Sequence, residues 1–446
     1  MTTGSLQRTV WMVGLSGALL LSACGEKEVI LPGARENLRD VLSEQDTPTA
    51  PALVENLVRP FASTRQSANS EWTQSSGSPA TRINHPALGA NLTHVWSNNI
   101  GAGDSRKTRI TADPVVGGGR IYTLDSQAQV VATSTGGGTV WTRDLTPARD
   151  RATDASGGGL AYAKGRVYVA SGFGLMTALD AATGAIVWQQ KLDSSATGSP
   201  TVSGGIVYLT SGDDLGWAIN ADTGRIAWQL SANPDHHNVM GAPAPAITDK
   251  LAIFAYGSGE VQAAERKTGT RLWDTVVSGQ RRGFARSNVL DITADPVVVG
   301  DTIYLGTMAG RVMAIDIKTG ERLWTANEGA ISPVWVSGGS VFLISDRNEL
   351  LRLDASDGSR VWGTKLPFFT KNRPKRQKEI FAHYGPVLAG GRLVVTSSDG
   401  QIRSFDPKSG ALIGTTAVPG GATTNPVIAG RTLYVVSTKG QLHAFR

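Results

Sequence analysis

The stretch ADPVVVGDTIYLGTMAGRVMAIDIKTGERLW, residues 294–324, decides the fold because it contains one complete copy of a unit that recurs along the chain. Four short apolar runs follow one another in it, separated by turn residues at Gly300-Asp301, Ala309-Gly310 and Thr319-Gly320. Alternation of period two between glycine-containing turns is typical of consecutive antiparallel strands joined by hairpins. Each unit is therefore predicted to be a four-stranded meander.

The clearest mark of the unit is a glycine four residues before a tryptophan. This pair occurs as Gly184/Trp188, Gly224/Trp228, Gly269/Trp273, Gly320/Trp324 and Gly358/Trp362, in a degenerate copy as Gly137/Trp141, and once with Gly414 in place of the tryptophan after Gly410. A last copy, residues 423–446, supplies three strands before the chain ends, and residues 93–96 (THVW) supply the missing fourth. Seven copies and one that is split between the termini make eight.

A period of about 40 to 50 residues with four strands per unit favours a propeller over a sandwich or a solenoid. The split copy favours a closed ring, because an open array would need capping units at its ends. We therefore predict an all-β, eight-bladed β-propeller over residues 91–446, closed by an N-terminal outer strand. The repeated tryptophan would wedge between blades, where burial contributes up to about 5 kcal/mol per blade.

The N-terminal residues 1–23 have the pattern of a secretory signal peptide, with Arg8 before a short apolar run. Leu21-Ser22-Ala23-Cys24 resembles the lipobox of bacterial lipoproteins, which implies acylation of Cys24, the only cysteine of the chain. Gly25 then implies sorting to the outer membrane, facing the periplasm. Residues 24–90, rich in proline and polar residues, are predicted to form a flexible tether, in which residues 36–45 have the spacing of a short amphipathic helix. Trp72 is a candidate for docking on the ring.

The formal net charge of +6 is a mild excess, and its densest part is a basic insertion that holds Lys371, Arg373, Lys375, Arg376 and Lys378. Phe368, Phe369 and Phe381 flank it. For an exported protein this pattern indicates a solvated loop, a contact with anionic lipid head groups or a contact with an acidic protein, and it disfavours nucleic acid.

Catalytic motifs are missing from the sequence. It contains no Gly-x-Ser-x-Gly, His-Glu-x-x-His, phosphate-binding loop or Cys-x-x-Cys pattern. His236 and His237 are adjacent, but they lack acidic ligands at a known spacing, so we expect no metal there. No catalytic residue, metal or cofactor is predicted.

Copies such as GRVYVASGFGLMTALDAATGAIVW (165–188) and residues 302–324 closely resemble the pyrroloquinoline-quinone (PQQ) type propeller repeat. Joined to a lipobox, eight such repeats resemble the BamB family of lipoproteins of the outer-membrane β-barrel assembly (BAM) machinery. This resemblance implies a non-enzymatic scaffold that binds the POTRA domains of BamA and assists the insertion of outer-membrane proteins.

The alternatives are a PQQ-dependent quinoprotein dehydrogenase and an envelope-binding propeller with another partner. A second cysteine for the vicinal disulfide that many quinoproteins carry is absent. Trp335 is the one residue able to imitate a quinone-stacking tryptophan, and packing explains it better. Asp113 and Asp295 precede prolines at equivalent places of their repeats, which favours a structural role over catalysis.

In the BamB family two neighbouring interblade loops carry the BamA contacts, and the matching stretches here are residues 235–241 and 288–295. The resemblance implies an apolar centre of Val239, Met240 and Leu290, rimmed by Arg286 and Asp291. Thr293 stands where the family has a second acidic residue, and Met240 where it has an arginine. The open outer strands of the blades offer a second mode of binding, the addition of a strand from an extended client.

Overall fold

The computed structural model describes residues 56–75, 77–80, 83–233, 242–277, 279, 281 and 291–446. All of them lie in one compact unit, residues 55–446. The predicted signal peptide, Cys24 and the helix at 36–45 lie outside the described residues and stay predictions. Within the described ranges, no helix has the length and hydropathy that a membrane span needs.

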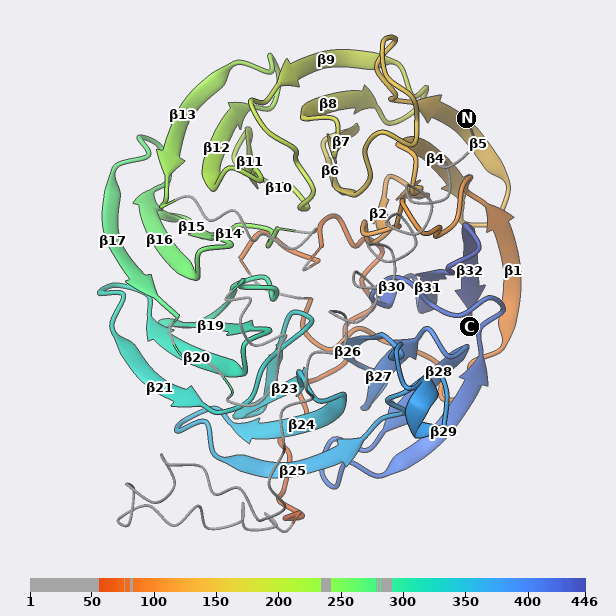
Figure 1. Ribbon diagram of the computed structural model, residues 1–446, viewed down its shortest axis with the longest axis vertical. Coiled ribbons are helices and arrows are strands. Elements are labelled where there is room, and N and C mark those ends of the chain that lie inside the picture. Colours follow the sequence, from red (N-terminus) through yellow and green to blue (C-terminus); the bar gives the residue numbers. More distant parts are fainter. Residues whose placement is uncertain are drawn as a thin grey trace, which may run out of the picture. The chain divides into compact units, whose positions relative to one another are not determined.

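The described strands form eight four-stranded antiparallel sheets, which are the blades of a closed ring (Figure 1). Blades 1 to 4 consist of β2 (Val115–Gly117), β3 (Arg120–Leu124), β4 (Gln129–Ser134) and β5 (Thr139–Asp144); β6 (Gly158–Ala163), β7 (Arg166–Ser171), β8 (Leu175–Asp180) and β9 (Ile186–Lys191); β10 (Thr201–Ser203), β11 (Ile206–Thr210), β12 (Leu215–Asn220) and β13 (Ile226–Ser231); β14 (Ala246–Ile247), β15 (Leu251–Ala255), β16 (Glu260–Glu265) and β17 (Arg271–Val276). Blades 5 to 8 consist of β18 (Val297–Val299), β19 (Thr302–Thr307), β20 (Arg311–Asp316) and β21 (Arg322–Ala326); β22 (Trp335–Ser337), β23 (Ser340–Ile344), β24 (Glu349–Asp354) and β25 (Arg360–Lys365); β26 (His383–Ala389), β27 (Arg392–Ser397), β28 (Gln401–Phe405) and β29 (Leu412–Ala417); β30 (Val427–Ala429), β31 (Thr432–Val436), β32 (Gln441–Phe445) and β1 (His94–Asn99).

The ring closes in blade 8, where the chain's N-terminal strand completes the C-terminal sheet. The strand order there is β1-β32-β31-β30, and β1 pairs antiparallel with β32, with Ser97 opposite His443. Thr93 and Arg446 exchange backbone hydrogen bonds of 2.8 and 2.9 Å just beyond the two strands. The predicted eight-bladed propeller with a split repeat is confirmed.

The recurring tryptophans lie on the outermost strands and pack against the next blade, as predicted. The glycine of each repeat contacts the tryptophan of the preceding repeat, not its own. Gly358, for example, has φ +74°, and a Cβ there would lie 2.5 Å from Cε3 of Trp324. The indole Nε1 of Trp324 then donates to the carbonyl of Ala355 at 2.9 Å. Only glycine combines a positive φ with so close an approach, which explains the pair.

The missing tryptophan at Gly414 has a structural reason. Trp141, Trp188, Trp228, Trp273, Trp324 and Trp362 each lie against a glycine in the turn between the third and fourth strands of the following blade. Blade 8, which follows Gly414, has no such turn because its third strand is β32 and its fourth is β1, which are not consecutive in the chain. No atom lies within 4 Å of a Cβ placed on Gly414.

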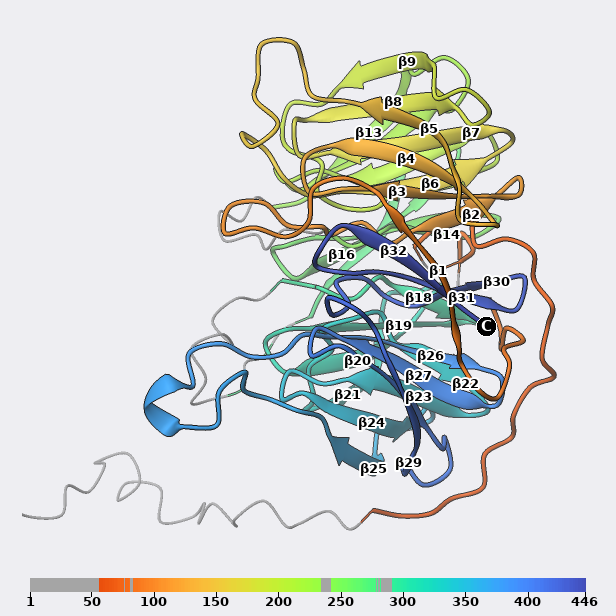
Figure 2. The ribbon, with the colours of Figure 1, turned by 90° about the vertical axis from the view of Figure 1, so that its right-hand side faces the viewer.

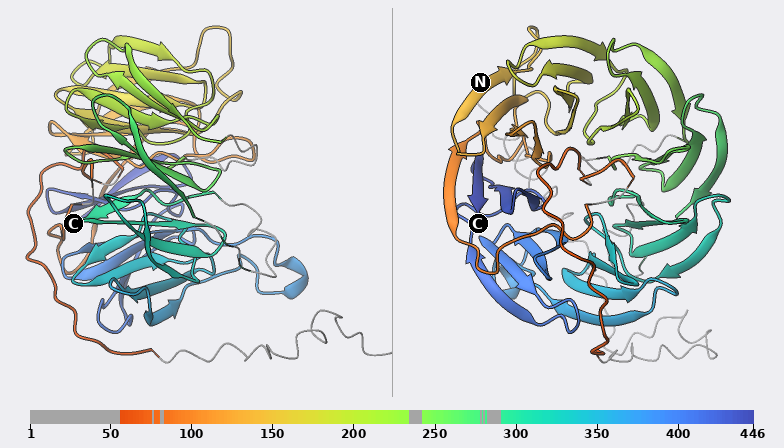
Figure 3. Two further views of the ribbon diagram at one scale, coloured as in Figure 1. Left: turned by 90° about the vertical axis from the view of Figure 1, so that its left-hand side faces the viewer. Right: turned by 180° about the vertical axis from the view of Figure 1, so that it is seen from behind.

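The described residues between 56 and 92, which we call the strap, run across one face of the ring (Figures 2 and 3). This strap face carries the turns between first and second strands; the opposite, loop face carries the connections from one blade to the next. Trp72, 1% exposed, forms an antiparallel bridge with Val116 of blade 1 and so docks as predicted. The described part of residues 24–90 is therefore bound to the ring, which corrects the prediction of a flexible tether from residue 56 onward.

The strap contacts every blade, because its backbone and the side chain of Gln74 supply hydrogen-bond partners to the inner strands, the turns and Arg352. Its bonds reach, in chain order, blade 6 (Arg352 to the carbonyls of Arg59 and Pro60), blade 8 (Gly430 N–H to Asn69), blade 1 (Trp72 with Val116), blade 2 (Tyr162 N–H to Thr73), blade 3 (Gln74 with Val202), blade 4 (Ile247 N–H to Pro79), blade 5 (Val298 N–H to Ala80) and blade 7 (Gly390 N–H to Pro86).

Loss of one wedge should destabilise the ring strongly. Trp362 is fully buried and donates to Pro407 of blade 7 at 3.2 Å, so Trp362→Ala should lower the free energy of unfolding by about 3 to 5 kcal/mol. Gly414→Ala, at the equivalent position of the next blade, is the matched control and should change it by less than about 1 kcal/mol. Urea unfolding followed by tryptophan fluorescence measures both. Equal costs for the two would contradict the wedge.

The closure in blade 8 should weaken in acid. Burial first, and then the neighbouring His94, lowers the pKa of His443 from 6.5 to about 4. Between these values the unfolded chain binds a proton that the folded chain does not, so stability should fall as the pH drops from about 6.5 to about 4, by up to about 3 kcal/mol. His443→Asn keeps a partner for Ser97 and should flatten this dependence in melts recorded across that window. An unchanged slope would argue against His443 as its source.

Candidate functional site

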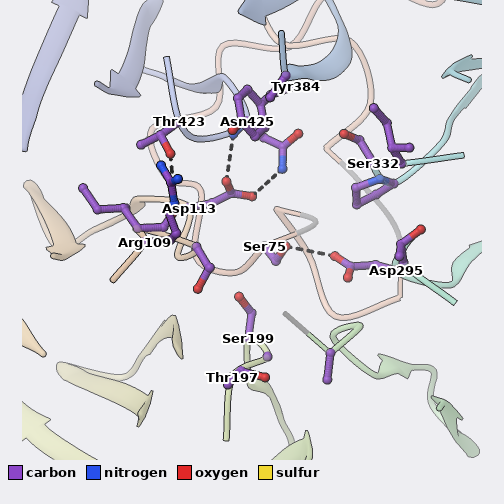
Figure 4. A pocket seen from close by; sticks show the side chains of 18 of the residues that line it. Ser75, Arg109, Asp113, Thr197, Ser199, Asp295, Ser332, Tyr384, Thr423 and Asn425 are labelled. Atoms are coloured by element: carbon purple, nitrogen blue, oxygen red, sulfur yellow. Dashed lines mark hydrogen bonds between the residues drawn. The ribbon is translucent and has the colours of Figure 1, made fainter. Parts of the chain in front are cut away.

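A polar cavity of about 500 Å³ lies on the axis of the ring, where the connections into the innermost strands meet. Figure 4 shows side chains of several blades converging on it. Its polar lining includes Ser75, Asp104, Arg109, Asp113, Thr197, Ser199, Thr293, Asp295, Ser332, Tyr384, Thr423 and Asn425. This is the central channel of the propeller.

The carboxylates of the channel join neighbouring blades. Asp113 of blade 1 accepts the backbone N–H and the side-chain Nδ2 of Asn425 in blade 8, both at 2.8 Å. Asn425 in turn accepts the N–H of Gly385 in blade 7 at 2.8 Å. The carboxylate of Asp295 in blade 5 accepts the backbone N–H of Ala244 in blade 4 at 2.8 Å. The residue before each of these prolines thus ties its blade to the preceding one, which confirms the structural role predicted for Asp113 and Asp295.

The strap reaches the channel from one side. Ser75 donates to Oδ2 of Asp295 at 2.9 Å, as Figure 4 shows. Near the loop face, burial raises the pKa of Tyr384 to about 12, so its phenol is protonated at neutral pH and is no base. Arg109 lies 3.6 Å from Asp104 and is more than half exposed. These groups are hydrogen-bonded or paired in ways that hold the ring together.

Trp335 does not line the channel. It is buried on the inner strand β22 and borders a separate cavity of about 440 Å³, next to Val297 and Ser337. Packing therefore explains it, as the sequence analysis favours. In the described part of the chain, no group of three or more His, Cys, Asp or Glu side chains is placed to hold a metal ion.

Of the residues predicted to bind a partner, Val239, Met240, Arg286 and Leu290 lie outside the described residues, as do His236 and His237. Thr293 is described, lines the channel and donates to the carbonyl of Ala330 at 2.8 Å.

The position of Asp291 differs from the one predicted for it. Its side chain is 3% exposed, so its carboxyl does not form a rim open to solvent. The residue follows directly on the undescribed stretch 282–290, and Ile292 beside it bridges to Thr307 of β19. The chain is already tied into blade 5 at this point, which accounts for the burial.

An ionic cluster lies beside the connection between β17 and β18, and the sequence analysis does not predict it. Arg281 contacts Asp346 at 2.8 Å and Glu328 at 3.2 Å, and Arg347 and Arg360 also reach Glu328. Burial by itself lowers the pKa of Arg281, but the hydrogen bonds and charges of Asp346 and Glu328 raise it overall. Its partners lie 47 and 65 residues away in sequence, so no local pattern could have indicated the cluster. It fixes the chain just before residues 282–290.

Comparison with known proteins gives a family. A family model described as "Outer membrane protein assembly factor BamB" matches residues 128–364 and 372–446. The assembly factor BamB of Salmonella typhimurium is 30% identical over 327 residues, which cover 72% of this chain and 80% of that protein. That of Escherichia coli K12 is 28% identical over the same shares of the two chains.

Two solved structures share the fold. BamB from Moraxella catarrhalis superposes with a TM-score of 0.63 at 19% identity, covering 80% of this chain and 98% of that one. Quinohemoprotein alcohol dehydrogenase from Comamonas testosteroni gives the same TM-score at 15% identity, covering 85% and 81%. Because an assembly factor and an oxidoreductase fit equally well, these superpositions show the fold and do not separate the functions.

The link between Asp113 and Asn425 should appear as non-additivity. Asp113→Ala removes the acceptor of two donors, the backbone N–H and the side-chain Nδ2 of Asn425. Asn425→Ala removes that Nδ2 and also the side-chain oxygen that accepts the N–H of Gly385. Each substitution should lower the free energy of unfolding by about 2 to 3 kcal/mol. The double variant should cost about 1 to 2 kcal/mol less than the sum. Chemical denaturation of the four proteins measures the coupling, and simple additivity would show that the two side chains act independently.

Proposed function

This chain belongs to the BamB family of outer membrane protein assembly factors, and from this premise we propose that it acts as a non-enzymatic scaffold in the BAM complex. The observation that carries the proposal is the family match across the propeller, residues 128–364 and 372–446. The state of the channel supports it, because Asp113, Asp295 and Asn425 are engaged in bonds between blades. A scaffold needs surfaces rather than a reactive pocket.

We propose BamA as the partner of this scaffold, bound through the POTRA domains of BamA. We assign the contact to Val239, Met240, Arg286 and Leu290, which belong to the connections between β13 and β14 and between β17 and β18. Asp291 and Thr293 follow in the second connection, where Asp291 is buried and Thr293 lines the channel. Connections of this kind open on the loop face, which the strap leaves uncovered. The cluster around Arg281 holds the chain where the second connection begins. Asp291, being buried, would shape this surface from beneath.

Unfolded outer-membrane proteins are the second class of partner in this proposal. The outermost strands keep one edge free of any strand in the described ring, and they expose aliphatic side chains around it. These are Val95, Val140, Ile186, Val187, Ile226, Leu272, Val276, Leu323, Leu412 and Ile413. An extended apolar segment would gain main-chain hydrogen bonds and apolar contacts by pairing with such an edge.

The scaffold is assigned to the periplasmic face of the outer membrane, held by lipid on Cys24. The lipobox pattern at residues 21–24 and Gly25 supports this position. Acyl chains on one residue hold a protein at a bilayer because each buried methylene contributes about 0.8 kcal/mol. Labelling with palmitate that persists in Cys24→Ala would exclude this anchor.

The scaffold function is tested by co-purification from detergent-solubilised envelopes with a C-terminally tagged chain. BamA should copurify with the parent, and Val239→Glu with Met240→Glu should abolish it, because two carboxylates would be desolvated in an apolar contact. Ala148→Glu with Thr153→Glu places the same charges on an exposed connection of blade 1 and should leave BamA bound. A photoreactive residue at Leu323 should label clients in the same envelopes.

Absence of BamA from the parent sample would overturn the assembly role, and labelling of clients confined to loops would overturn the edge-strand part. Equal loss of BamA with the control pair would move the contact away from residues 239 and 240. Reduction of a dye with an alcohol or a sugar, after reconstitution with quinone and Ca²⁺, would instead establish the oxidoreductase.

A further inference from the structure

A hairpin stands out from the loop face between β25 of blade 6 and β26 of blade 7 (Figures 2 and 3). We call residues 366–382 the basic hairpin. Its arms are paired by hydrogen bonds from Thr370 N–H to Glu379 at 3.0 Å and from Phe381 N–H to Phe368 at 2.8 Å. The 3₁₀ turn η2 (Pro374–Arg376) forms its tip.

The base of the basic hairpin is fixed to the ring. His383 is buried, with Nε2 2.7 Å from the carbonyl of Pro367 and Nδ1 2.7 Å from the hydroxyl of Ser397. The side-chain Nδ2 of Asn348 donates to the carbonyl of Phe381 at 2.9 Å. The backbone carbonyl of Asn348 accepts the N–H of Leu366. A purely solvated loop would not need such an attachment, which presents the tip in one direction.

The tip is a concentration of uncompensated positive charge. Lys371, Arg373, Lys375, Arg376 and Lys378 are all exposed, and none forms an ion pair within the described part of the chain. Glu379 is the one acidic residue of the hairpin, so its formal charge is +4, from five cations and one anion. Charges that a protein leaves unpaired on a protruding element attract anions from outside.

Apolar side chains lie directly beside these charges. Phe369 and Ile380 face each other across the two arms and are 37% and 45% exposed. Phe368 packs edge-on against Phe369, with the ring centres 4.7 Å apart. Cations at the tip and an aromatic and aliphatic pair behind them match the two layers of a bilayer surface, the head groups and the upper part of the acyl chains.

We propose that the basic hairpin is a membrane-contact element that binds anionic phospholipid head groups through its five cations and inserts Phe369 and Ile380 beside them. A lipid surface fits better than an acidic protein because the element is a projecting tip, without the surrounding concave surface that a specific protein interface would provide. This inference goes beyond the proposed scaffold function. The contact would turn the loop face of the ring toward the bilayer.

The test uses residues 25–446, which leave out the predicted leader and Cys24 and keep the compact unit 55–446. Sedimentation with vesicles of phosphatidylcholine alone and of phosphatidylcholine with phosphatidylglycerol measures binding. Binding should require phosphatidylglycerol and should weaken as salt rises from about 0.1 M to about 0.5 M. Gln at positions 371, 373, 375 and 376 (K371Q, R373Q, K375Q, R376Q) should reduce the vesicle affinity by roughly 100-fold or more.

The matched control removes four exposed charges elsewhere on the loop face, as R106Q, K107Q, R149Q and R151Q, and should change the affinity by less than about 3-fold. Thermal melts confirm that both variants fold. Because the chain from residue 25 has no cysteine, Phe369→Cys carries a single environment-sensitive dye, whose emission should shift to the blue on anionic vesicles. A dye on Lys267→Cys, in an exposed turn on the strap face, should not respond.

Equal binding to both kinds of vesicle, equal loss in the control variant or an unresponsive dye at residue 369 would each overturn the proposal. Loss of a copurifying protein from envelopes with the hairpin variant, together with unchanged vesicle binding, would assign the tip to an acidic protein instead. The vesicles contain no protein, so a negative result leaves the scaffold function untouched; that function fails only if BamA does not copurify.

Discussion

The contact between an outer-strand indole and a glycine of the next blade is the interaction on which this ring depends. A single blade cannot bury its own tryptophan, since a four-stranded sheet by itself would leave one face of the indole in water. The glycine must have a positive φ and no Cβ, and the indole must reach a carbonyl of the neighbour, as Trp324 does with Ala355. The glycine requirement is steric and the indole hydrogen bond is polar and directional. Together they fix the angle between neighbouring blades as well as stabilising their packing.

Two further devices act where this contact is not available. At the axis, side chains before the inner-strand prolines accept N–H groups of the preceding blade, as Asp113 does from Asn425. On one face, the strap bonds to every blade and so links parts of the ring that are not neighbours. Blade 8, made from both ends of the chain, is flanked by the position that lacks a tryptophan. The strap bonds to both sides of that junction, to blade 7 through Pro86 and to blade 8 through Asn69.

The ring was predictable because its information is local and repeated: alternating strands, glycine-containing turns and a fixed spacing before each tryptophan. The split repeat even gave the closing strand. The course of the strap was not predictable, because residues 56–90 have no periodicity and their partners lie up to several hundred residues away, as with Arg59 and Arg352. The ionic cluster of Arg281 is invisible in the sequence for the same reason. The burial of Asp291 was not predictable either, because the family resemblance matches residue types and does not indicate how exposed a side chain is.

The two faces of the ring have different chemistry, and this difference bears on where a partner can bind. The strap uses the backbone groups of one face, and interblade bonds use the acidic groups of the channel. What remains are the loop face and the outer edges. The basic hairpin, with a base fixed by His383 and Asn348, belongs to the loop face, as do the connections assigned to BamA. A membrane contact and a protein contact on one face would be compatible, because the hairpin lies between blades 6 and 7 and the assigned connections lie between blades 3 and 5. The long strap would then serve to keep the opposite face closed while the loop face does the binding.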